Sequence, residues 1–198
     1  MPTTCPASLK TGPPLFPAPV VNREIKLVLG GEPGGGERGA RVEVPAAPDV
    51  GFFGRDETLL ALDRAFDRHG VVLLHAYAGS GKSSTAAEFA RWYKRTGGVE
   101  GPVLWTSFER RMTLPQVLDA LGRVFVGTLE KNGVQWLALD DGERRGIALQ
   151  ILKQTPVLWV WDNVEPVTGF PAGTASAWTA EEQKELVDFL REARGTKA

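Results

Sequence analysis

The stretch "VVLLHAYAGSGKSST", residues 71–85, decides which fold class this chain can adopt. It starts with an apolar run of strand length, passes through a glycine-rich turn and continues into a segment with helical periodicity. The turn nearly matches GxxxxGK[ST], a pattern in which backbone N–H groups and a helix N-terminus surround phosphate groups. Ala76 stands where the first glycine of the pattern belongs. Since this position ends the strand and does not surround the phosphates, a small residue is sufficient there.

Each residue type in the turn has a predicted task. Gly79 and Gly81 allow positive φ angles and a close approach of the backbone to phosphate. Lys82 is expected to reach the β and γ phosphates, and the Ser83 hydroxyl is expected to join the ligands of Mg²⁺. The alternative interpretation is a glycine-rich turn that carries a surface lysine. The flanking strand and helix patterns favour the phosphate loop.

The remaining sequence has the pattern of an α/β protein. Apolar runs without polar alternation, separated by helical segments, are typical of a parallel sheet that is covered on both faces. We therefore predict a three-layer sandwich of the P-loop NTPase type with a mostly parallel sheet. The predicted strands are 71–76, 102–108 and 157–161, and the predicted helices are 57–69, the segment from the loop to Gly97, 114–125, 136–153 and a last helix that begins near Thr179, where Glu182 completes a capping box.

Residues 1–48 differ in composition from the rest of the chain. They are rich in proline and contain the glycine cluster "GGEPGGGERG", which is typical of a linker or loosely packed leader. Two short runs, "EIKLVL" and "ARVEV", flank the cluster and could form a β-hairpin. The sequence therefore predicts a leader at 1–48 and a P-loop NTPase domain at 49–198.

Acidic residues follow the third predicted strand in "LWVWDNVE". A phosphate loop that uses magnesium needs a carboxylate near the end of a neighbouring strand. Asp162 follows the strand directly, so we predict that it holds the metal through a water molecule. Glu165 is a candidate general base that orients the attacking water, or else a solvated loop carboxylate. Asn163 could instead hold that water by a hydrogen bond.

The composition limits the other classes of function. The chain has 198 residues, 23 basic and 24 acidic, with a net charge of -1, so no overall field attracts nucleic acid or a membrane surface. One cysteine and two histidines exclude a disulfide framework and argue against an all-protein zinc site. The sequence shows neither a signal peptide nor an apolar run of membrane-spanning length. We expect a cytoplasmic location.

Three segments in their order and spacing resemble a known family: "GFFGRDETLLALDRAF", "VVLLHAYAGSGKSSTAAEFARWY" and "PVLWVWDNVEPV". They are similar to the signal-transduction ATPases with numerous domains, the STAND branch of the P-loop ATPases that includes the NB-ARC and NACHT groups and is related to AAA+ proteins. The resemblance runs from about Val50 to the C-terminus. It implies an ATP/ADP switch with Mg²⁺, in which ADP holds a closed monomer and ATP permits homo-oligomerisation that activates an attached effector.

The resemblance also implies roles for individual residues. Gly54 and Arg55 would contact the adenine side of the nucleotide, while Phe52 and Phe53 are equally well explained as core anchors. Asp162 would be the Walker B metal ligand, and the leader would link an effector domain to the ATPase. The Walker A loop would comprise Ala78, Gly79, Ser80, Gly81, Lys82, Ser83 and Ser84.

The sequence departs from the family after the Walker B strand. Family members continue to a further strand with a polar nucleotide sensor, then to a winged-helix region and repeats, whereas this chain stops at "REARGTKA". In the family's sheet the sensor strand lies between the Walker A and Walker B strands, so its loss would leave two unpaired strand edges. We therefore expect either a fragment with an incomplete sheet or a sheet that closes differently, and hydrolysis by this chain alone stays open.

Two other functions remain as alternatives. A P-loop kinase for a small molecule would need arginines over the phosphates, and "FERRM" at 108–112 and "GERRG" at 142–146 are the candidates for such a lid. Their pattern is more typical of surface charge beside helices. The other alternative is a nucleotide-binding or interaction fragment that does not hydrolyse ATP.

Overall fold

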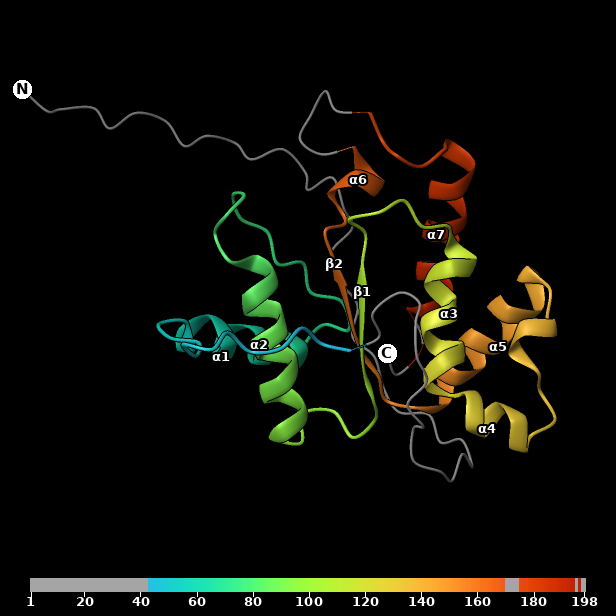
Figure 1. Cartoon of the computed structure of the whole chain (residues 1–198), viewed down its shortest axis with the longest axis horizontal. Coiled ribbons are helices and arrows are strands. Elements are labelled where there is room, and N and C mark those ends of the chain that lie inside the picture. The colour runs from blue at the N-terminus through green and yellow to red at the C-terminus, as the bar shows by residue number, and fades with distance from the viewer. Residues whose placement is uncertain (1–42, 170–174, 195, 197–198) are drawn as a thin grey trace, which may run out of the picture.

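The computed structural model describes residues 43–169, 175–194 and 196. Nearly all of the predicted leader hairpin lies outside these described residues. The described part contains a short parallel sheet and helices on both of its faces, as Figure 1 shows. This agrees with the predicted α/β class, although the sheet is smaller than predicted. Among the described residues, no helix combines the length and the apolar character that a bilayer crossing requires.

The sheet consists of β1 (Val103–Ser107) and β2 (Leu158–Asp162), which pair in parallel. Val103 lies opposite Leu158 and Ser107 lies opposite Asp162, so both strands end at the same edge. The chain between them forms α3 (Leu114–Val124), α4 (Val126–Lys131), the 3₁₀ helix η1 (Trp136–Ala138) and α5 (Asp141–Gln154). Parallel strands need a long crossover of this kind because a hairpin cannot join them.

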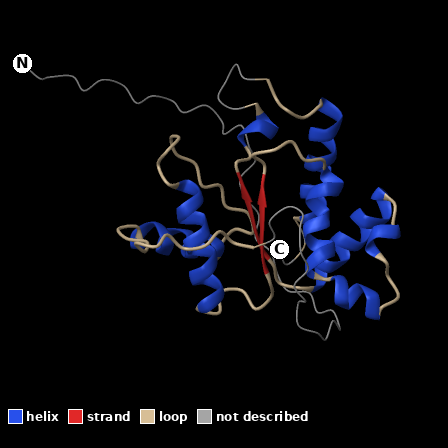
Figure 2. Cartoon of the chain, viewed as in Figure 1, coloured by secondary structure: helices blue, strands red, loops and turns tan. Residues whose placement is uncertain are grey.

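The side chains of the strands alternate between two apolar clusters. Leu158 and Val160 belong to the cluster on the side of α1 (Asp56–Phe66) and α2 (Lys82–Arg95). Trp159 and Trp161 pack into the larger cluster under α3, α5 and α7 (Ala180–Ala193). Figure 2 shows the strands between these two layers of helices. Period-two alternation with both faces apolar explains why the strand sequences contain no polar positions before Asp162 and Thr106.

The predicted strand at 71–76 is not formed in the structure. Among the described residues, β2 pairs only with β1, and the segment 71–76 has no ladder partner. Val71 and Leu73 are each 61% exposed. The prediction failed because an apolar run becomes a strand only where a neighbouring strand accepts its backbone hydrogen bonds. The sheet of the described residues thus has two strands, and the expectation that the chain is a fragment stays a prediction.

Helix boundaries differ from the predictions where local caps intervene. The predicted helix 57–69 spans Asp56–Phe66, and Arg55 takes the N-cap position. The predicted helix 136–153 is divided, because the Asp140 side chain accepts from Glu143 N and starts α5 anew. The capping box of Thr179 and Glu182 is confirmed at the start of α7. The short helices α4 and α6 (Glu165–Thr168) were not predicted.

Two helical glycines allow a test of the packing between α3 and η1. A Cβ added to Gly122 in α3 would lie 2.2 Å from the Trp136 ring, which is almost fully buried. A Cβ added to Gly146 in α5 would meet no heavy atom within 4 Å. We expect Gly122→Ala to lower the free energy of unfolding by about 1–3 kcal/mol through overpacking. Gly146→Ala should raise it by up to about 1 kcal/mol, since alanine has the higher helix propensity.

Urea denaturation of the two variants and the wild type measures both effects. The two substitutions add the same methyl group, so their opposite signs separate packing from helix propensity. A stabilised Gly122→Ala protein would contradict the close contact with Trp136.

Candidate phosphate-binding site

The loop 76–81 leads directly into α2, as the phosphate-loop pattern predicts. Gly79 and Gly81 have φ angles of 75° and 80°, in the left-handed region that favours glycine. Gly81 is the N-cap residue of α2, so the N–H groups of the first helical turn face the loop. Nothing lies within 4 Å of a Cβ added to Gly79, so the backbone angle and not steric space requires glycine there. This geometry is of the kind found where anions bind at a helix N-terminus.

Lys82 has two acceptors in the structure. Its Nζ donates to the carbonyl oxygen of Ala76 at 3.1 Å and lies 3.7 Å from Glu165 Oε1. The Lys82 side chain therefore folds back across the mouth of the loop. Its exposed fraction is 23%, and that of Glu165 is 38%, so the pair is partly shielded from water. The structure thus joins two of the predicted catalytic residues directly.

Ser83 and Asp162 form the contact between α2 and the end of β2. The Ser83 hydroxyl donates to Asp162 Oδ1 at 2.8 Å, and the bond is partly buried. A hydroxyl and a carboxylate at this spacing are oxygen ligands of the kind that Mg²⁺ prefers. No group of three His, Cys, Asp or Glu side chains that could hold a metal occurs in the part of the chain that the structure describes. A metal here would therefore depend on water and phosphate oxygens for its other ligands.

Arg55, at the N-cap position of α1, also contacts the loop. Its guanidinium donates to the carbonyl oxygen of Ser80, and one of its nitrogens is 3.7 Å from the position of a Cβ on Gly81. Gly54, with a φ of 75°, makes the turn that places Arg55 there. The hydroxyl of Ser80 is buried and has no hydrogen-bond partner among the described residues. Arg55 is thus in contact with the loop, and its predicted contact with adenine stays a prediction.

The two phenylalanines before this turn have different environments. Phe52 is partly buried against the cluster of Leu59 and Phe89, as one of the two interpretations predicted. Phe53 is 82% exposed and anchors no core. The other predicted loop members, Ala78 and Ser84, are exposed and make no side-chain hydrogen bond that the structure describes.

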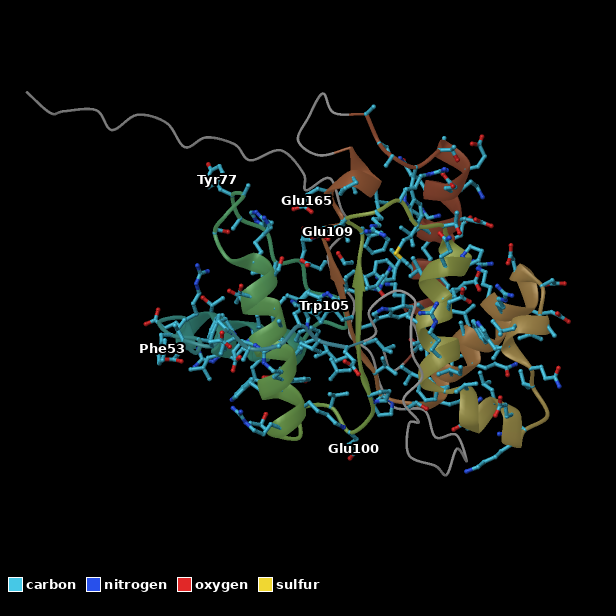
Figure 3. The ribbon with its side chains drawn as sticks, in the orientation of Figure 1. Phe53, Tyr77, Glu100, Trp105, Glu109 and Glu165 are labelled. Carbon is cyan, nitrogen blue, oxygen red and sulfur yellow. The ribbon has the colours of Figure 1, made fainter. Side chains whose placement is uncertain are left out.

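Sequence reasoning missed three features of the site. It did not find the ion pair of Lys82 with Glu165 or the bond from Arg55 to Ser80. It also gave no role to Tyr77, which is 93% exposed at the tip of the loop in Figure 3. Tyr77 could have been noticed in the sequence, because an aromatic residue is unusual inside a glycine-rich turn. The other two contacts join segments far apart in sequence and leave no local pattern.

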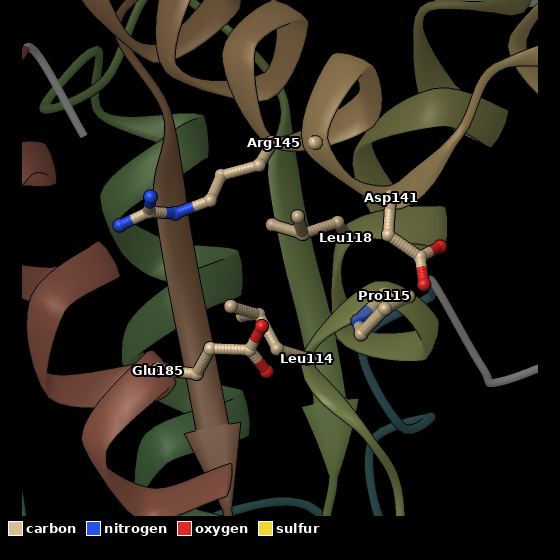
Figure 4. Close-up of a pocket in the computed structure, with 7 residues that line it drawn as sticks. Leu114, Pro115, Leu118, Asp141, Arg145 and Glu185 are labelled. Atoms are coloured by element: carbon tan, nitrogen blue, oxygen red, sulfur yellow. The ribbon is translucent and has the colours of Figure 1, made fainter. Parts of the chain in front are cut away.

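Three of the four arginines considered as a kinase lid form ion pairs with residues outside the phosphate loop. Arg111 contacts Glu182 at 2.6 Å, and this hydrogen bond lowers the pKa of the Glu182 carboxyl below its usual value. Arg145 contacts Glu192 at 2.8 Å, and Arg144 lies 3.8 Å from Asp119. Arg145 also borders a hollow of about 190 Å³ between α3, α5 and α7, shown in Figure 4, which no residue of the phosphate loop lines. These ion pairs favour the surface-charge interpretation of both segments.

Comparison with known proteins agrees with the geometry of the loop. No curated protein and no solved structure gives a significant match. The family model described as "AAA ATPase domain" matches residues 51–195. This range includes Arg55, the loop 76–84, both strands and Asp162. The match covers most of the chain, and the protein therefore belongs to the AAA ATPase domain family.

Proposed function

We propose that this chain is the ATP/ADP-binding switch module of a STAND-type signalling ATPase. Membership in the AAA ATPase domain family implies nucleotide binding in a P-loop ATPase. The observation that carries the proposal is the hydrogen bond from Ser83 Oγ to Asp162 Oδ1. It brings together the two residues that the motif assigns to Mg²⁺, directly beside Lys82.

The residues of the site fit a nucleotide with Mg²⁺. The left-handed glycines and the N-cap at Gly81 place the backbone N–H groups of the first turn of α2 at the loop, an arrangement that suits a polyphosphate. The buried Ser80 hydroxyl keeps a hydrogen-bonding group unused beside it. Lys82 would bind the β and γ phosphates, while Ser83 and Asp162 would hold Mg²⁺. When bound, Mg²⁺ would supply charge neutralisation at the phosphates.

The remaining residues have supporting roles in this proposal. Glu165, beside Lys82 at the mouth of the loop, would orient a water molecule as the general base in a hydrolysing context. Arg55 and Gly54 would fix the loop from the adenine side.

The switch assignment and its partners belong to the same proposal. Its support is the GR turn at Gly54 and Arg55 and the strand that ends in Asp162 and is followed by Asn163, two features of the resemblance. The ion pairs of Arg111, Arg144 and Arg145 weigh against a kinase lid. We propose a cytoplasmic module that acts with effector and repeat domains and oligomerises in response to the nucleotide.

Replacement of Lys82 tests whether the loop binds phosphate. We expect Lys82→Ala to weaken binding of ADP and of a non-hydrolysable ATP analogue about 10- to 100-fold, the usual cost of losing a hydrogen bond to a charged group. Isothermal titration calorimetry of the whole chain measures the two affinities. The matched control is Lys153→Ala, which removes an exposed lysine in the last turn of α5. Equal affinities of wild type and Lys82→Ala would refute the phosphate loop.

Replacement of Asp162 tests the metal assignment separately. Asparagine keeps the shape of the side chain and an oxygen that accepts from Ser83, but it removes the charge that a divalent cation needs. We expect Asp162→Asn to retain binding of the ATP analogue without Mg²⁺ and to lose most of the change in affinity that Mg²⁺ causes. Asp49→Asn, at an exposed position, is the control. If Mg²⁺ changed the affinity of Asp162→Asn for the ATP analogue as much as that of wild type, the metal would be bound by other residues.

A further inference from the structure

We propose that Glu165 competes with nucleotide phosphates for Lys82 and thereby sets the affinity of the site and its preference between di- and triphosphates. This inference rests on the proposed nucleotide binding. It concerns Glu165 as a positioning residue that acts through Lys82, which is a separate role from that of a general base. The observation behind it is the distance of 3.7 Å between Lys82 Nζ and Glu165 Oε1.

The backbone directs Glu165 toward the loop. Asn163 has a φ of 56° and is the single non-glycine residue with a positive φ in the described part of the chain. Asparagine tolerates this left-handed conformation better than most residues, because its short polar side chain can hydrogen-bond locally. The turn ends β2 abruptly and starts α6 at Glu165. A special backbone angle directly before an ion pair with the loop lysine points to a defined position for Glu165.

Contacts with the segment before α7 fix α6 in place. Ala177 N donates to the carbonyl oxygen of Pro166 at 2.8 Å, and Ser176 Oγ donates to that of Val167 at 2.8 Å. Gln183 Nε2 also donates to Val167 O at 3.2 Å, and the Val167 side chain is 5% exposed. The element that carries Glu165 is therefore anchored in the larger core. An anchored carboxylate loses less conformational entropy in an ion pair than one on a free loop.

The negative charge of Glu165 beside Lys82 affects how a nucleotide would bind there. The Lys82 ammonium has three donors, of which one is used by Ala76 O and one faces Glu165. A phosphate that binds Lys82 has to share or replace the carboxylate, and the two anions repel each other at this spacing. The repulsion grows with the charge of the nucleotide. Glu165 therefore penalises a triphosphate more than a diphosphate whenever Mg²⁺ does not neutralise the charge.

Binding of ADP and of a non-hydrolysable ATP analogue by the full chain, both without Mg²⁺, tests the inference. We expect Glu165→Gln to bind both nucleotides more tightly by about 3- to 10-fold, as for a partly exposed ion pair, with the larger gain for the triphosphate. The gain should shrink at about 0.5 M salt, where charges are screened within a few ångströms. A role of Glu165 in the fold alone would produce neither the salt dependence nor the difference between the nucleotides.

Two further variants identify the cause of the gain. Glu165→Asp keeps the charge but withdraws the carboxylate from Lys82 by one methylene group, so it should show part of the gain. Glu109→Gln removes an exposed carboxylate at the same edge of the sheet, near Glu165 in Figure 3, and should show none. Thermal unfolding of each variant verifies that it is folded.

The possible outcomes are distinct. If wild type binds nucleotide and Glu165→Gln binds it equally well or more weakly, the competition does not exist and the phosphate loop still stands. An equal gain in Glu109→Gln would assign the effect to the general field of the edge and overturn the role of Glu165. If wild type binds neither nucleotide, the proposed function and this inference both fail.

Discussion

The hydrogen bond between Ser83 and Asp162 is the interaction on which the site depends. In this structure the phosphate loop is not joined to the sheet through a paired strand, because the segment 71–76 has no ladder partner among the described residues. Two kinds of side-chain contact connect α2, which follows the loop, to the sheet. The apolar face of α2, with Phe89 and Ala90, packs on the Leu158 side of the sheet. The polar contacts of Ser83 and Lys82 then bind the start of the same helix to the ends of β2 and α6.

This arrangement divides the stability of the loop between two kinds of contact. The packing of α2 is hydrophobic and insensitive to ligands, whereas the contacts at its N-terminus are polar groups that phosphate and metal would also bind. If phosphate or metal replaced the present partners of these polar groups, the contact between the loop and the sheet would change while the apolar core stayed the same. Regions held by few buried contacts and exposed backbone are the ones that open most easily. The site therefore combines a fixed helix with an adaptable attachment, as the proposed nucleotide-dependent switch would require.

The success of the sequence predictions follows from whether the signal is local. The loop, the start of α2, both strands and the cap of α7 at Thr179 depend on residues within one turn or one strand, so their patterns are visible in the sequence. The pairing of 71–76 depends on a neighbour that the local pattern does not specify. For the same reason the contacts of Arg55 with Ser80 and of Lys82 with Glu165 had no sequence signal. Asn163 lay within the motif, but its left-handed angle became visible only in the structure.

The turn at Asn163 assigns the two carboxylates that follow β2 to different partners. Asp162, the last residue of the strand, extends toward the hydroxyl of Ser83, and Glu165, after the turn, extends toward the ammonium of Lys82. A hydroxyl is a neutral ligand that can share a carboxylate with a metal, while an ammonium is a charge that a carboxylate neutralises. In the proposed site, phosphate would therefore compete with Glu165, and Mg²⁺ would be attracted by Asp162. Because one short segment carries both carboxylates, the charge balance at this edge is set by the backbone geometry of Asn163 as much as by the acidic side chains themselves.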